Sequence, residues 1–223
     1  MDLGRYSDSF QRAFEGKAAA RDKALVASRR SIRFSANAIR AIHRGEFDEA
    51  HALMDQSRQA IEDGRDAVRS DHPDVYFAGF LQDAQKEYAE ACITEAVVTG
   101  ADLPSPETLD VELAPYVNGM AEAVGEGRRA VLDLLRRGEV DRSERILTTM
   151  EDIYYLLVSM DFPGAITRNL RRSTDAARGI MERTRGDLSM SLVQRNLQQA
   201  LERQVRQARD PAAGRTARPP RRS

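Results

Sequence analysis

The sequence is poor in the residues that build disulfides, zinc sites and membrane spans. It has one cysteine, Cys92, in 223 residues, which excludes an intramolecular disulfide and a cysteine-based zinc site within one chain. No stretch approaches the roughly 20 consecutive apolar residues of a membrane helix, and the N-terminal residues lack the apolar core of a secretory signal. These absences argue against membrane insertion and export, and they predict a cytoplasmic protein.

Tryptophan is absent, and aromatic residues make up only 6% of the chain. There is no alternating strand pattern and no Gly-rich phosphate loop, which argues against a nucleotide-binding α/β fold. The three histidines, His43, His51 and His72, form neither a His-x-x-x-His nor a Glu-x-x-His pattern, so a ferritin-like di-iron site lacks its nitrogen ligands. Hydrophobic residues make up 41% and charged residues 31% of the chain, a mixture that favours an all-α protein with a real core.

Apolar residues recur at helical intervals along most of the chain. This periodicity predicts one helical domain over residues 1–208, with an antiparallel pair formed by its first two helices. The predicted helices span residues 16–44, 47–70, 74–99, 110–137, 139–160, 166–185 and 188–208. The segment 146–162 is the most apolar, and we expect it to serve the core and subunit assembly.

Positive charge is concentrated at the C-terminal end. Residues 203–223 contain seven arginines and one acidic residue, so residues 1–202 carry a net charge of −7. The end of this segment is too rich in Pro, Gly and Arg to pack. We therefore expect a disordered tail at residues 209–223, which either adds non-specific affinity for nucleic acid or only keeps the chain in solution.

Two pairs of glutamates are the main candidates for chemistry. Glu87 and Glu90 are three residues apart, and Glu122 and Glu126 are four apart, so each pair shares one face of its helix. If the two helices pack together, the four carboxylates form a site for a hard divalent cation. Taken alone, such a pair is more often a solvated helix face than a set of metal ligands, and helical phase places Glu90, Glu122 and Glu126 toward polar faces.

The order and spacing of several short segments resemble the translin family, and within it the catalytic branch, translin-associated factor X. The resemblance covers most of residues 17–192. It rests on Arg21-Asp22-Lys23 followed by Ser28-Arg29, Ile39-Arg40-Ala41-Ile42-His43-Arg44, Glu87-Tyr88-Ala89-Glu90-Ala91, Asp110-Val111, Tyr116-Val117-Asn118-Gly119, Gly125-Glu126 and Arg137-Gly138-Glu139.

This resemblance implies a seven-helix bundle that assembles into a barrel-like homo-oligomer, commonly an octamer, and binds single-stranded RNA or single-stranded DNA. The factor X branch is a magnesium-dependent endoribonuclease. By position, Glu87, Glu90 and Glu126 match its acidic residues, and Glu122 stands where that branch has Asp. The resemblance therefore implies Mg²⁺ or Mn²⁺ held by Glu87, Glu90, Glu122 and Glu126. The side chain of Glu122 is one methylene longer than the Asp of that branch.

An acidic site needs cationic groups nearby, because carboxylates repel phosphate. The candidates for nucleic-acid binding are Arg29, Arg30 and Arg33 on the first helix, and Arg128 and Arg129 beside the second acid pair. Each is equally compatible with an ordinary solvated surface. Two further functions stay open at this point: a non-catalytic nucleic-acid-binding oligomer of the same fold, and a helical scaffold with neither activity.

Overall fold

The computed structural model describes residues 3–69 and 71–209. Within these residues all regular secondary structure is helical, which confirms the predicted all-α fold. Three single turns connect long helices: α3 (Pro73–Tyr76), α5 (Pro106–Leu109) and α8 (Gly164–Thr167). The long helices are α1 (Gly4–Arg44), α2 (Phe47–Asp66), α4 (Phe80–Thr99), α6 (Leu113–Arg136), α7 (Val140–Val158) and α9 (Leu170–Arg209).

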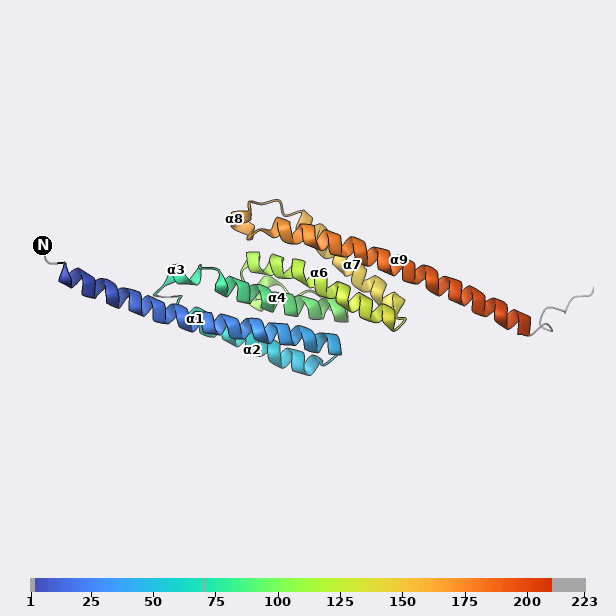
Figure 1. Cartoon of the computed structure of the whole chain (residues 1–223), viewed down its shortest axis with the longest axis horizontal. Helices are drawn as coiled ribbons and strands as arrows, with labels where there is room; N and C mark the ends of the chain where they lie inside the picture. The colour runs from blue at the N-terminus through green and yellow to red at the C-terminus, as the bar shows by residue number, and fades with distance from the viewer. Residues whose placement is uncertain (1–2, 70, 210–223) are drawn as a thin grey trace, which may run out of the picture.

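The long helices lie side by side along one axis (Figure 1). The predicted pairing of the first two helices is confirmed, since α1 packs against α2. At the centre, α4 packs against α1 and α6, and α6 also packs against α7 and α9. The α4–α6 contact therefore joins the two halves of the bundle. The start of α1 and the end of α9 extend past the bundle in opposite directions (Figure 1).

The main hydrophobic core is shared by helices from both halves. Ile42 of α1, Ile93 of α4 and Val124 of α6 are fully buried in it. Helix α7 adds Met150 and Leu157, as expected from its apolar pattern. The core thus holds α4 and α6 together along the length that carries the candidate acids.

Two predicted helix boundaries are wrong. The helix expected over residues 74–99 is interrupted, because Gly79 adopts a φ of 110° that only glycine tolerates well, and α4 begins after it. The helices expected over 166–185 and 188–208 are one continuous helix, α9. A glycine inside a helix costs only about 1 kcal/mol, and Met181 and Leu188 pack with α7 on both sides of Gly186.

The other differences lie at chain ends and loops. Helix α1 begins at Gly4 rather than near residue 16. The helix expected from residue 110 begins at Leu113 instead. Asp110 has a left-handed backbone at the end of α5, and its carboxylate lies 2.5 Å from Arg65 Nη1. The expected disordered tail lies outside the described residues, apart from the backbone of Arg209, which ends α9. Among the described helices, none is long and apolar enough to cross a membrane.

Candidate metal centre and its cleft

The candidate site lies where the backbones of α4 and α6 approach closely at Gly119. A Cβ at Gly119 of α6 would lie 2.6 Å from the Lys86 carbonyl oxygen and 3.0 Å from the Glu90 amide nitrogen of α4. The first contact is too short for non-bonded atoms and the second is tight, so only glycine permits this approach without a shift of the helices. Because Glu122 lies one turn beyond Gly119, the approach places Glu122 beside the Glu87–Glu90 pair.

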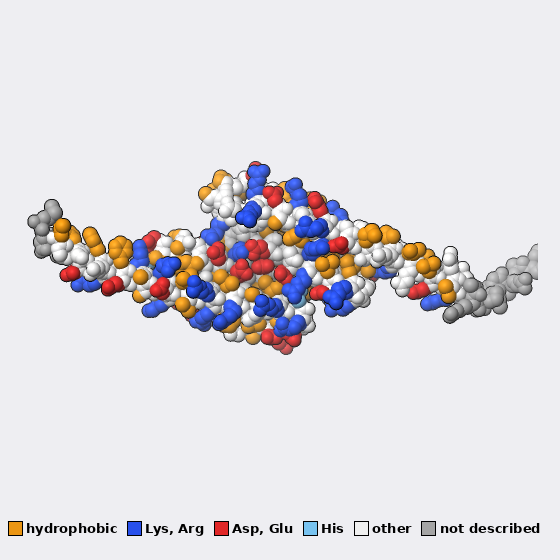
Figure 2. Space-filling model, in the orientation of Figure 1, with side chains coloured by type: hydrophobic (Ala, Val, Ile, Leu, Met, Phe, Trp, Pro, Cys, Tyr) orange, Lys and Arg blue, Asp and Glu red, His pale blue; other side chains and the backbone are white. Residues whose placement is uncertain are grey.

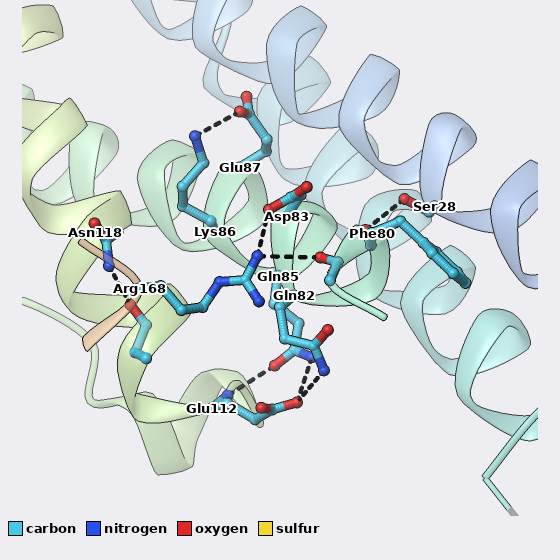
Figure 3. Close-up of polar contacts among 12 residues, drawn as sticks. Ser28, Phe80, Gln82, Asp83, Gln85, Lys86, Glu87, Glu112, Asn118 and Arg168 are labelled. Carbon is cyan, nitrogen blue, oxygen red and sulfur yellow. Dashed lines mark hydrogen bonds and ion pairs between the residues drawn. The ribbon is translucent and has the colours of Figure 1, made fainter. Parts of the chain in front are cut away.

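A polar anchor fixes the start of α6 against α4 (Figure 3). Glu112, which precedes α6, accepts hydrogen bonds from Gln82 and Gln85, each with a nitrogen-to-oxygen distance of 3.0 Å, and one from Tyr76 at 2.8 Å. The Glu112 backbone amide also donates to Gln85 at 2.7 Å. These hydrogen bonds set the register of α6 relative to α4, which the spacing of the acids requires.

The structure brings three of the four predicted carboxylates together. One oxygen from each of Glu87, Glu90 and Glu122 lies within 4.8 Å of the other two. Figure 2 shows a group of acidic side chains in the middle of this face, with Lys and Arg side chains around it. Three oxygen donors from two helices at these separations form a donor set suited to a divalent cation.

Glu90 is the buried member of this group, with 8% of its surface exposed. Glu90 thus lies among polar groups, as helical phase predicted, but it is not a solvated surface residue, because α6 covers it. Burial, together with the negative charges of Glu87, Glu122 and Glu126, raises the pKa of Glu90 to about 8. Near neutral pH this carboxyl group is therefore largely protonated, and a cation close to it favours its anionic form.

Lys86 supplies such a cation in the structure itself. Its ammonium nitrogen lies 2.7 Å from both carboxylate oxygens of Glu122 and 3.1 Å from an oxygen of Glu87, and Figure 3 shows the second of these pairs. Burial acts to lower the pKa of Lys86, but its acidic partners outweigh burial and raise that pKa. Sequence analysis did not select Lys86, although its position one turn before Glu90 is a signal that it faces the same group.

Glu126 lies outside the group of three. Its carboxylate is 2.5 Å from the Nε2 of the buried His43, at the end of α1, and 3.7 Å from Arg129. The hydrogen bond with His43 is the main cause that lowers the pKa of Glu126. His43 and Glu126 are far apart in sequence and no local pattern connects them, so only the packing of α1 against the rest of the bundle reveals this pair.

The predicted cationic residues fall into two classes. Arg29 and Arg33 are exposed on α1, and neither forms an ion pair within the part of the chain that the structure describes. The other three have acidic partners: Arg30 pairs with Asp63 at 3.5 Å, Arg128 with Asp187 at 2.8 Å, and Arg129 with Glu126. Arg128 also donates to Thr184 at 3.1 Å, so it links α6 to α9.

The raised pKa of Glu90 predicts an unusual dependence of stability on pH. Because its pKa is about 8 in the folded chain and 4.5 ordinarily, the folded protein binds the extra proton between these values, and stability falls as pH rises through them. In chelator, we expect the wild-type free energy of unfolding to fall by about 2–4 kcal/mol more than that of Glu90→Gln between pH 5 and 8.5. Urea unfolding at a series of pH values measures this difference, and parallel curves for the two proteins would contradict it.

Known proteins resemble this chain in both sequence and structure. No family model matches it. An uncharacterized protein of Methanocaldococcus jannaschii, MJ0175, is 31% identical over 189 residues, which cover 84% of this chain and 83% of the relative. The archaeal AfC3PO is 33% identical, with a TM-score of 0.74 over 86% of this chain and 98% of AfC3PO. The chain belongs to the C3PO family of translin-type proteins.

Two further C3PO structures extend this comparison. AfC3PO in a complex with duplex RNA has a TM-score of 0.73 and 30% identity, and the match covers 86% of this chain and 98% of that one. The apo form of NeC3PO, from Neurospora, has a TM-score of 0.72, with 85% and 97% covered. At 18% identity, NeC3PO supports the fold alone. The translin resemblance inferred from short segments is thereby confirmed at the level of the family.

Proposed function

We propose that this C3PO-family chain binds single-stranded RNA and hydrolyses its phosphodiester bonds with Mg²⁺ or Mn²⁺, as the factor X branch does. Support for RNA as the partner comes from AfC3PO, which is 30% identical and has been solved with duplex RNA. Single-stranded DNA is a second nucleic acid that the chain binds in this proposal, through the same contacts to phosphate. A barrel-like, octamer-like homo-oligomer accompanies this function.

The convergence of Glu87, Glu90 and Glu122 is the observation that carries the catalytic part of the proposal. Their oxygens lie within 4.8 Å of one another. The raised pKa of the buried Glu90 supports a cation at this place, because a positive charge would favour its anionic form. These three residues would hold the ion. When bound, it supplies an activated water and neutralises charge that develops on the phosphate.

Glu126 has a different role in this proposal. Its hydrogen bond with His43 occupies one carboxylate oxygen and lowers the pKa of Glu126, which keeps this carboxylate ionised. An ionised carboxylate accepts hydrogen bonds from water. We therefore assign Glu126 to orienting the attacking water, with His43 as the residue that positions Glu126.

Two surface features support binding and assembly. Arg29 and Arg33 leave guanidinium groups exposed on α1, where they can bind phosphates bidentately. On α7, Tyr155, Leu156 and Val158 are exposed next to the core residues of the same helix. An exposed apolar group of this kind favours contact with another subunit, so α7 is our candidate for the subunit interface.

A labelled single-stranded RNA tests the proposed activity. We expect the purified protein to cut it with Mg²⁺ or Mn²⁺ and not with EDTA. Glu122→Gln removes a ligand charge and should weaken Mn²⁺ binding, measured by calorimetry, by at least about tenfold. Glu122→Asp is the matched control, because it keeps the carboxylate and should keep most of both binding and cleavage. Unchanged Mn²⁺ affinity in Glu122→Gln would contradict the ligand assignment.

A non-catalytic RNA-binding oligomer is the second candidate, and Lys86 is the observation that favours it. Its ammonium group forms ion pairs with Glu87 and Glu122, so the folded chain supplies one positive charge to these acids without any metal. This candidate predicts RNA retention with neither cleavage nor Mn²⁺ binding. A wild-type protein with that combination of results would replace the first proposal by the second.

A further inference from the structure

The acidic group lies beside a cleft, and arginine side chains line the opposite wall of this cleft. The cleft has a volume of about 840 Å³ and lies between the α4–α6 pair and the corner where α8 meets α9. Glu90 and Glu122 line it on the first side, and Arg168 and Arg172 line it on the second. A chain that lies in this cleft therefore meets both the carboxylates and the guanidinium groups.

Three cationic side chains line the cleft, and two of them already have partners. Lys86 pairs with Glu122, and Arg168 donates to Asp83 at 2.9 Å and to the Gly79 carbonyl oxygen at 3.4 Å (Figure 3). The guanidinium group of Arg172 is exposed and has no ion pair or hydrogen bond within the described part of the chain. It is thus the lining cation that is available to an anionic ligand.

The backbone that carries Arg172 is held firmly against α6. Asn118, which is 6% exposed, donates to the Thr167 carbonyl oxygen at 2.8 Å and accepts from Ser173 at 3.1 Å. The turn before α9 is closed by two left-handed residues, Arg168 and Asn169, at φ values of 52° and 65°. This bonding fixes the first turn of α9, and therefore Arg172, relative to the acidic group.

We infer that Arg172 is a substrate-positioning residue that binds a backbone phosphate of the RNA in this cleft. The inference rests on the proposed RNA binding and does not require cleavage. A guanidinium group binds phosphate through two parallel hydrogen bonds, and the partial positive charge at the start of α9 adds to the attraction. Arg172 thereby offsets the repulsion between the phosphate chain and the carboxylates on the other side.

RNA binding measured by fluorescence anisotropy in EDTA tests this role. We expect Arg172→Gln to raise the Kd about tenfold, as the loss of one phosphate contact does, and to reduce the salt dependence of binding by about one ion. Arg172→Lys should recover part of the affinity because it keeps the charge. Arg171→Gln is the matched control: it removes the same charge from the next exposed residue, which does not line the cleft, and should change the Kd less than twofold.

The outcomes separate this inference from the proposed activity. If Arg172→Gln and Arg171→Gln bind RNA equally, the inference is overturned even when the wild-type protein binds and cuts RNA. If the wild-type protein binds RNA without cutting it and only Arg172→Gln weakens binding, the inference holds and the catalytic proposal fails. A wild-type protein that binds no RNA would overturn both. Unfolding curves should not distinguish the two variants, because among residues 3–69 and 71–209 neither side chain has an ion pair or hydrogen bond to lose.

Discussion

Glu90→Gln should lower the rate of metal-dependent RNA cleavage by at least about 100-fold. The substitution keeps the shape of the side chain and removes the charge of the most buried member of the acidic group. Because the neutral amide no longer attracts a divalent cation, we expect Mn²⁺ binding to be lost with cleavage. Single-turnover cleavage of a labelled RNA and calorimetry with Mn²⁺ measure the two effects.

The stability of the same variant distinguishes a lost ligand from a damaged fold. Since the buried anion of Glu90 is unfavourable beside Glu87 and Glu122, Glu90→Gln should be more stable than the wild type in chelator above pH 8. Glu144→Gln, on the exposed face of α7, is the control for loss of one acidic charge and should retain cleavage. Cleavage by Glu90→Gln at the wild-type rate would refute the metal-site assignment.

Gly119→Ala should be the most destabilising small substitution on α6. Its Cβ would lie 2.6 Å from the Lys86 carbonyl oxygen and 3.0 Å from the Glu90 amide nitrogen. These are backbone atoms of α4 and cannot rotate away, so the helices must separate. We expect a loss of about 2–3 kcal/mol in the free energy of unfolding, and weaker Mn²⁺ binding because Glu90 and Glu122 move apart.

Gly125→Ala on the same helix is the matched control. Its Cβ would meet only the Cδ1 atom of Ile180, at 3.8 Å, an ordinary contact. Replacing a helical glycine with alanine where space allows should raise stability by about 0.5–1 kcal/mol. Urea unfolding of both variants at one protein concentration measures these opposite effects. A Gly119→Ala protein as stable as Gly125→Ala would show that the two helices do not approach as closely as described.

The arrangement of the acids shows what local sequence predicts and what it does not. The Glu87–Glu90 pair follows from helical spacing alone. Helical periodicity also predicted both ends of α2, α6 and α7 to within a few residues, and the C-terminal end of α4. Burial did not follow from spacing, because the polar face that carries Glu90 is covered by a neighbouring helix. Likewise, the sequence around Gly186 suggests the end of a helix. In the structure α9 continues past Gly186, because residues on both sides of it pack on α7.

By itself, the sequence determined that this chain is all-α, that it resembles the translin family, and which glutamates are candidates for a metal site. These features depend on the identity and spacing of residues along single helices. Only the tertiary structure decided that Glu87, Glu90 and Glu122 meet and that Lys86 pairs with Glu122. It also decided that Glu126 bonds His43 instead and that Arg172 lies across the cleft. The reason is physical: these groups interact between helices, and the distances between helices depend on how the whole core packs.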